Sequence, residues 1–213
     1  MNSGKNVYQI TKEAYTALIR VGQADWNDAA GEFIASAGSL TLRWAMEREQ
    51  NRIPVTLPNG TKITLSPGGQ NPVISAVIAE FCPRFTSGGQ VLYIGDADEK
   101  WVVREDEALA DLGITVDDHG KMPDVVIYDV TNKWLVLVEA VTSHGPMDAK
   151  RLDELKSLFA GSTLPMVFVT AFEDRSGFKR WVGDLAWETE VWLASDPSHM
   201  VHWNGDRYLG PHP

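Results

Sequence analysis

The chain has 213 residues, of which 44% are hydrophobic and 23% are charged, and its formal net charge is −10. This composition is ordinary for a globular protein and excludes an intrinsically disordered chain. No apolar run approaches the roughly 20 residues that span a bilayer, and the polar N-terminus lacks the apolar core of a signal peptide. Cys82 is the single cysteine, which excludes an intrachain disulfide. We therefore expect a cytoplasmic protein with no membrane partner.

The negative charge is concentrated in one segment of the chain. Residues 95–118 carry a local net charge of −7, and the remainder of the chain sums to only −3. Basic residues gather instead in Lys150-Arg151, in Lys179-Arg180 and at Arg207. The net charge by itself argues against a nucleic-acid partner, but its distribution is compatible with one.

The first 52 residues predict a small and mostly helical segment. A short strand is expected at residues 7–10, and Thr11 is typical of the N-cap of a helix that begins KEAYTALIR. Two further helices are expected, at residues 26–36 and at residues 40–48, because apolar residues recur there at helical spacing.

Residues 53–213 predict a second domain of the α/β class. It opens with VTLPNGTKITL, two alternating strands around Pro-Asn-Gly, which is a strong hairpin signal. Helices and apolar strands then alternate, so a mixed central β-sheet flanked by helices is the natural packing. The expected helices are 72–81 (ended by Pro83), 105–113, MDAKRLDELKSLF (opened by Pro146 and capped by Gly161) and 176–187; the expected strands are 91–95, 124–130, 134–141, 165–172 and 189–195.

Asp124 and Glu139 lie on two adjacent predicted strands that a short turn joins into a hairpin. Strand alternation places Glu139 on the same face as Leu137 and Val141, and a carboxylate this late in an apolar strand needs a partner. Two carboxylates from neighbouring strands can hold a divalent cation of the kind that phosphodiester hydrolysis uses. Alternatively, Asp124 caps its strand and Glu139 pairs with a nearby arginine or lysine.

The sequence around these two residues resembles the BsuBI/PstI family of restriction endonucleases. Residues 122–147, MPDVVIYDVTNKWLVLVEAVTSHGPM, are similar to the catalytic core of that family. The similarity extends over roughly residues 40–213 and contains long, specific motifs such as EAVTSHGP. The other similar segments are IPVTLPNGTKITLSPGGQN, AEFCPRF, VLYIGDAD, VFVTAF, AWETEVWLAS and HMVHWNGDRYLGP.

The resemblance implies a nuclease core of the PD-(D/E)xK type, dependence on Mg²⁺, and cleavage of double-stranded DNA at a short palindrome, with CTGCAG suggested. It makes Asp124 and Glu139 the catalytic metal ligands. Val141 stands where the wider superfamily commonly has a lysine, and a valine can neither orient water nor stabilise an anion. Lys150, on the helix after the Glu139 strand, is our candidate for that role; alternatively it is a surface lysine paired with Glu154.

Further residues are candidates for the same site. Lys121 and Lys100 are lesser candidates for the role of the lysine. Asp96, at the end of a buried strand, and Glu80, on the preceding helix, are candidates for additional metal ligands. Alternatively, Asp96 shapes a turn and Glu80 is a solvated helix residue. The residues expected to contact DNA are Ser143, His144, Arg151, Asn204 and Arg207.

The resemblance also sets expectations for the assembly. A palindromic site favours a C2 homodimer with one active site per DNA strand. A cognate DNA methyltransferase would act on the same site in a restriction–modification system. Residues 1–52 resemble the tail of a winged-helix domain that precedes the nuclease core in full-length relatives. Two alternative functions stay open, a structure-specific repair nuclease of the same fold and a catalytically impaired DNA-binding module.

Overall fold

The structure is a computed structural model of the whole chain. It describes residues 10–116, 121–142 and 145–203, and of residues 39–41 it describes the backbone alone. Among the described residues, no helix is both long enough and apolar enough to cross a bilayer.

The chain divides into two compact units, residues 1–50 and residues 51–213; the sequence predicts a boundary between residues 52 and 53. The first helix of the first unit, α1, spans Lys12–Leu18. Its N-cap is Thr11, as predicted, and the Thr11 hydroxyl oxygen accepts a hydrogen bond from the backbone N–H of Ala14 at 3.2 Å. The strand predicted at residues 7–10 lies almost wholly outside the described residues.

The second helix, α2, spans Trp26–Gln50 as one uninterrupted helix of 25 residues. The prediction of two separate helices, at 26–36 and at 40–48, is therefore wrong. Gly38 lies between the two predicted helices, but a single glycine costs a helix only about 1 kcal/mol and the segment contains no proline.

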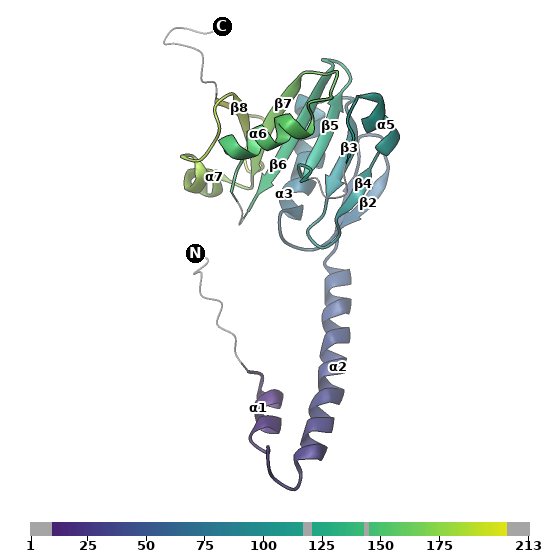
Figure 1. Cartoon of the computed structure of the whole chain (residues 1–213), viewed down its shortest axis with the longest axis vertical. Coiled ribbons are helices and arrows are strands. Elements are labelled where there is room, and N and C mark those ends of the chain that lie inside the picture. The colour runs from purple at the N-terminus through teal and green to yellow at the C-terminus, as the bar shows by residue number, and fades with distance from the viewer. Residues whose placement is uncertain (1–9, 117–120, 143–144, 204–213) are drawn as a thin grey trace. The chain divides into compact units, whose positions relative to one another are not determined.

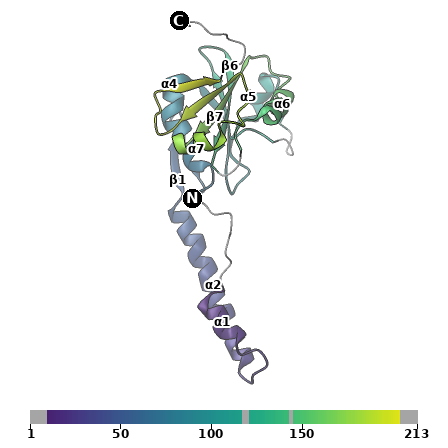
Figure 2. The same ribbon diagram turned by 90° about the vertical axis from the view of Figure 1, so that its left-hand side faces the viewer.

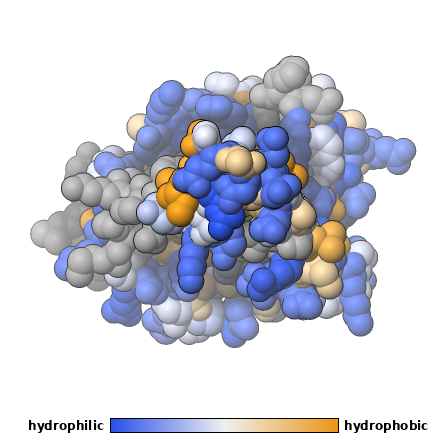
Figure 3. Space-filling view, turned by 90° about the horizontal axis from the view of Figure 1, so that it is seen from below, coloured by the Kyte–Doolittle hydropathy of each residue, from blue (hydrophilic) through white to orange (hydrophobic). Residues whose placement is uncertain are grey.

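Several large apolar side chains of this unit are exposed, among them Ile34, Leu42 and Trp44 of α2. On the face of the molecule shown in Figure 3, hydrophobic residues form small areas separated by hydrophilic ones.

The second unit contains a hairpin and a seven-stranded sheet, which Figures 1 and 2 show from two sides. The predicted Pro-Asn-Gly turn joins the two antiparallel strands of the hairpin. The bounds are β1 Ile53–Thr56, β2 Lys62–Leu65, β3 Gln90–Gly95, β4 Trp101–Arg104, β5 Val125–Asp129, β6 Trp134–Val141, β7 Met166–Phe172, β8 Thr189–Leu193 and β9 Met200–Trp203.

The seven strands of the sheet lie in the order β4-β3-β5-β6-β7-β8-β9. The pairs β6–β7 and β7–β8 are parallel and the other four pairs are antiparallel. The predicted mixed α/β sheet is thus confirmed. Strand β4 was not predicted, because it lies within the acidic segment, where the charges obscure its short apolar stretch.

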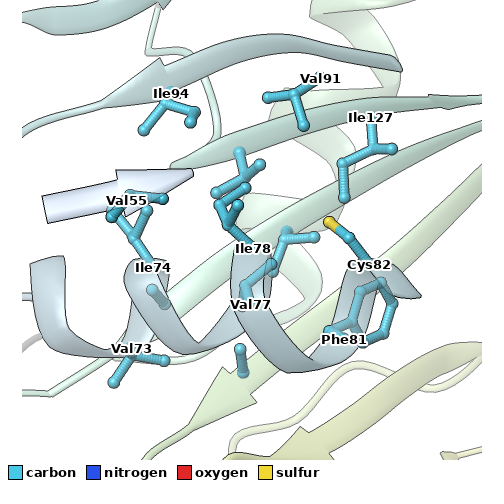
Figure 4. Close-up of a cluster of buried hydrophobic side chains, with 14 of the residues drawn as sticks. Val55, Val73, Ile74, Val77, Ile78, Phe81, Cys82, Val91, Ile94 and Ile127 are labelled. Carbon is cyan, nitrogen blue, oxygen red and sulfur yellow. The ribbon is translucent and has the colours of Figure 1, made fainter. Parts of the chain in front are cut away.

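One face of the sheet is covered by the helix that follows the hairpin (Figure 4). It begins as α3, Asn71–Ala76, widens into a π-helical turn, η1, at Val77–Phe81, and ends as α4, Cys82–Phe85. The prediction that Pro83 ends the helix is wrong. In the π-helical turn the backbone N–H of Cys82 bonds to the carbonyl of Val77, and this wider turn brings Pro83 into the first turn of α4, where its missing N–H costs nothing.

The opposite face of the sheet is covered by α5 and α6, which are Asp106–Asp111 and Ala149–Leu158. Asp148 is the N-cap of α6 and accepts from the backbone N–H of Arg151 at 2.7 Å. The helix therefore begins at Ala149, two residues after the expected first helical residue, Met147. Gly161 does not cap this helix, which ends at Leu158 with Phe159 as its C-cap. The last helix, α7, spans Arg175–Trp181 and is shorter than predicted.

Candidate active site

The two predicted metal ligands lie opposite each other at one end of the hairpin formed by β5 and β6. Val125 pairs with Val138 in the antiparallel register, which places Asp124 and Glu139 at the next step of the ladder. The backbone N–H of Ala140 donates to Oδ2 of Asp124 at 2.8 Å. The hairpin therefore brings the two carboxylates together.

Both carboxylates lie on the face of the sheet that α6 covers. Val126 and Leu137, which are two residues from Asp124 and Glu139 respectively, are buried in the cluster that α6 completes. Side chains two residues apart in a strand share a face. The position of Glu139 relative to Leu137 follows the alternation that the sequence predicts.

Glu139 is held by an arginine from α6. Nε and Nη2 of Arg151 donate to Oε1 of Glu139 at 2.8 and 2.6 Å, and Nη2 also donates to the backbone carbonyl of Met122 at 3.1 Å. The Glu139 side chain is 17% exposed and that of Arg151 is 18% exposed. The alternative interpretation of Glu139, a carboxylate that pairs with a nearby cation, is thus realised in this structure.

The surroundings of Glu139 disfavour its negative charge. Burial and the repulsion from Asp124 raise the pKa of the Glu139 carboxyl to about 7, although the ion pair with Arg151 acts in the opposite direction. Since one arginine does not offset the two unfavourable effects, the pair of carboxylates attracts further positive charge. A divalent cation bound through carboxylate oxygens supplies such charge.

Gln70, at the N-cap position of α3, reaches the same end of the hairpin. Its Nε2 lies 3.4 Å from Oδ1 of Asp124. The loop that carries Gln70 contains Gly68 and Gly69, which both have positive φ angles, and a Cβ on Gly69 would lie 2.9 Å from Cβ of Ala97. Only glycine fits this turn without strain. Gln70 was not predicted as a site residue, although the neighbouring glycines indicate a loop with positive φ angles.

Asp96 anchors that loop. Its Oδ1 accepts from the backbone N–H of Ser66 and from Nδ2 of Asn71, each at 2.8 Å. Its Oδ2 accepts from the backbone N–H groups of Asp98 and Glu99 at 3.0 and 2.9 Å. Burial by itself would raise the pKa of Asp96, but these hydrogen bonds outweigh it and the pKa is lowered. The structure thus places Asp96 as a loop anchor, and a role as metal ligand stays a prediction.

Glu80 and Lys150 are placed by the structure among solvated ion pairs. Oε2 of Glu80 lies 2.6 Å from Nη1 of Arg84, one helical turn away. Nζ of Lys150 lies 3.7 Å from Oε1 of Glu154, and the Lys150 side chain is 82% exposed. The predicted roles of Glu80 as a metal ligand and of Lys150 as the catalytic lysine stay predictions.

An open groove borders Arg151 on its solvent side. Lys121 and Lys150 line this groove together with Asp153 and Glu154. Val141, at the usual position of the lysine, is 5% exposed and packs into a hydrophobic cluster. The expected DNA contacts Ser143, His144, Asn204 and Arg207 lie outside the described residues.

The carboxylate oxygens of Asp124 and Glu139 suit a hard divalent cation such as Mg²⁺, because they come from two rigid strands and repel each other. Within the described ranges no cluster of three or more acidic, histidine or cysteine side chains forms around them. Mg²⁺ retains several water ligands when a protein binds it through one or two carboxylates.

Known proteins with similar sequences are restriction enzymes. The type II restriction enzyme BsuBI of Bacillus subtilis is 46% identical over 212 residues, which cover 100% of this chain and 67% of that enzyme. The type II restriction enzyme AplI of Arthrospira platensis is 34% identical over 98% of this chain and 66% of that enzyme. The chain thus spans about two thirds of the length of these relatives.

The fold has a solved counterpart in the SdaI restriction endonuclease. The two structures superpose with a TM-score of 0.72 at 41% sequence identity, over 95% of this chain and 64% of the SdaI chain. Residues 53–206, which include both carboxylates and Arg151, match the family described as the BsuBI/PstI restriction endonuclease domain. The chain therefore belongs to the BsuBI/PstI restriction endonuclease family.

Proposed function

We propose that this chain hydrolyses phosphodiester bonds of double-stranded DNA at a specific site, with Mg²⁺ held by Asp124 and Glu139. The observation that carries the proposal is the paired position of these carboxylates on one sheet face, where the charge of Asp124 helps to raise the pKa of Glu139. Membership of a restriction endonuclease family supports the same chemistry.

The residues of the site have distinct parts in this proposal. The bound cation would activate a water molecule and steady negative charge on the phosphate oxygens. Asp124 and Glu139 hold that cation, and the backbone N–H of Ala140 fixes the orientation of the Asp124 carboxylate. Lys121 and Lys150, which line the groove beside Arg151, can attract the DNA backbone to the site.

The recognition sequence and the assembly are also part of the proposal. Two relatives are named type II restriction enzymes, and we propose a palindromic target, CTGCAG, as the family resemblance suggests. A palindrome presents two equivalent strands, so a C2 homodimer would place one site on each strand. A methyltransferase of the same specificity would protect the host DNA.

Digestion of a plasmid that contains one CTGCAG site tests the proposal. The full chain with Mg²⁺ should convert the plasmid to a linear product, and sequencing of the ends should map the cut to that site. A plasmid in which the site is altered at one base is the matched control. Cutting of both plasmids would reject the specificity, and cutting of branched or mismatched DNA alone would indicate a repair nuclease. Metal-independent binding without any cutting would indicate a DNA-binding module.

A further inference from the structure

We infer that Arg151 supplies the cation that Val141 cannot: it holds Glu139 before the metal binds, and then contacts the phosphate that is cut. The inference rests on the proposed function and adds a named residue to it. It also revises the expectation from sequence, in which Arg151 is a general DNA contact and Lys150 takes the role of the lysine.

The guanidinium of Arg151 contacts both Glu139 and the backbone just before Asp124. Its Nε and Nη2 donate to the same oxygen of Glu139, and Nη2 also donates to the carbonyl of Met122, the residue directly before Pro123-Asp124. Three hydrogen bonds from one side chain fix the position of the charge more firmly than a surface pair would.

Helix α6 determines which cation reaches the site. Asp148 caps the helix, and Leu152 and Leu155 bury it against the sheet. Successive residues of a helix are rotated by about 100°, so Arg151 turns toward β6 while Lys150 stays 82% exposed. Val141 cannot serve, because it is an apolar residue within a hydrophobic cluster.

Arg151 and a divalent cation compete for the charge of Glu139. A cation held by Asp124 and Glu139 neutralises part of that charge and so weakens the attraction for Arg151. The guanidinium has five N–H donors and matches the geometry of a phosphate group. The groove beside Arg151 is open to solvent, so a phosphate of the DNA can approach it from that side. Arg151 would then exchange a carboxylate partner for a phosphate partner.

The test compares Arg151→Met, Arg151→Lys and the control Lys156→Met. Lys156 is an exposed lysine on the same helix, with Nζ 5.9 Å from the ring centre of Phe168, so the control removes one positive charge from α6 away from the site. Binding of Mn²⁺ without DNA is measured by calorimetry at about pH 8.5, together with the melting temperature. Cleavage of the CTGCAG plasmid is measured with Mg²⁺.

Arg151→Met should bind Mn²⁺ about tenfold more tightly than the parent, because a competing charge is gone. It should cleave at least about a hundredfold more slowly, the order expected for removal of a group that stabilises the transition state. Arg151→Lys should cleave at least about tenfold faster than Arg151→Met and bind Mn²⁺ within about threefold of the parent. Lys156→Met should match the parent in both measurements.

A merely structural role for Arg151 makes a different prediction, namely a lower melting temperature with equal or weaker Mn²⁺ binding. That result, or wild-type cleavage by Arg151→Met, overturns the inference. If Arg151→Met does not fold, Arg151→Lys becomes the deciding variant. The inference is then overturned if Arg151→Lys has the melting temperature of the parent but does not cleave DNA. Failure of the parent to cut any DNA would reject the proposed function instead, while the Mn²⁺ comparison would still test whether Arg151 competes for Glu139.

Discussion

The backbone N–H of Ala140 donates a hydrogen bond to Oδ2 of Asp124 at 2.8 Å, which ties the first carboxylate of the site to the residue after the second. The donor is main chain, so it persists when side chains are changed. An asparagine at position 124 can still accept this bond through its amide oxygen, and this allows the charge of Asp124 to be removed without loss of its contact.

Asp124→Asn should lower cleavage by at least about a thousandfold, because the charge that holds the cation is lost. Its melting temperature should stay close to that of the parent, since the bond from Ala140 remains and the repulsion of Glu139 is relieved. Plasmid cleavage and thermal unfolding are the measurements. Asp111→Asn, an exposed change at the end of α5, is the control and should behave as the parent does. Full activity of Asp124→Asn would remove this residue from the site.

The stability of the metal-free protein should depend on pH through Glu139. Its pKa is raised from 4.5 to about 7, so between these values the folded protein keeps a proton that the unfolded chain has lost. The stabilising contribution of Glu139 is therefore complete below pH 4.5 and is lost as the pH rises through about 7.

Glu139→Gln does not titrate, so it should gain stability relative to the parent between about pH 5 and about pH 8, by at most about 3 kcal/mol. Urea unfolding of both proteins at several pH values, with a metal chelator present, measures the difference. A constant difference across this range would contradict the raised pKa.

Asp96→Asn should destabilise the second unit by about 2–4 kcal/mol, the usual cost of breaking hydrogen bonds to a buried charged group. The amide nitrogen of the new side chain would face the backbone N–H groups of Asp98 and Glu99, which now donate to Oδ2. Denaturant unfolding measures the loss. Unchanged stability combined with loss of Mn²⁺ binding would instead assign Asp96 to the metal.

Gln70→Glu should raise the affinity for Mn²⁺ by about tenfold, because it adds a carboxylate beside Asp124, whose Oδ1 now lies 3.4 Å from the Gln70 amide. Gln70→Ala, the matched control, should stay within about threefold of the parent. Calorimetric titration distinguishes the two variants. Equal affinities for both would mean that residue 70 does not face the site in solution.

Cys82 should be inert toward a thiol reagent in the folded protein. It is 1% exposed in the core beneath the sheet (Figure 4), and burial raises the pKa of its thiol to about 12. Because the thiolate is the reactive form, modification should require opening of the core. Its rate should rise with urea together with the unfolded fraction, and rapid modification of the native protein would contradict the packing of the helix α3–η1–α4.

Local patterns in the sequence determined the hairpin and the pair of carboxylates. The alternation of β6 depends only on neighbouring residues, and the short turn after β5 sets the register. Asp124 and Glu139 could therefore be placed opposite each other without a structure. The local rule that a proline ends a helix failed at Pro83. The π-helical turn before it places Pro83 in the first turn of α4, where a proline is tolerated.

Only the tertiary structure decided which groups meet these carboxylates. Arg151 reaches Glu139 because α6 packs on one face of the sheet, and Gln70 reaches Asp124 from a loop 54 residues away. Adjacent lysine and arginine residues look equivalent in the sequence, but the rotation along a packed helix leaves the Arg151 side chain 18% exposed and the Lys150 side chain 82% exposed. The identity of the cation beside Glu139 is thus a property of packing between distant elements, and no local pattern encodes it.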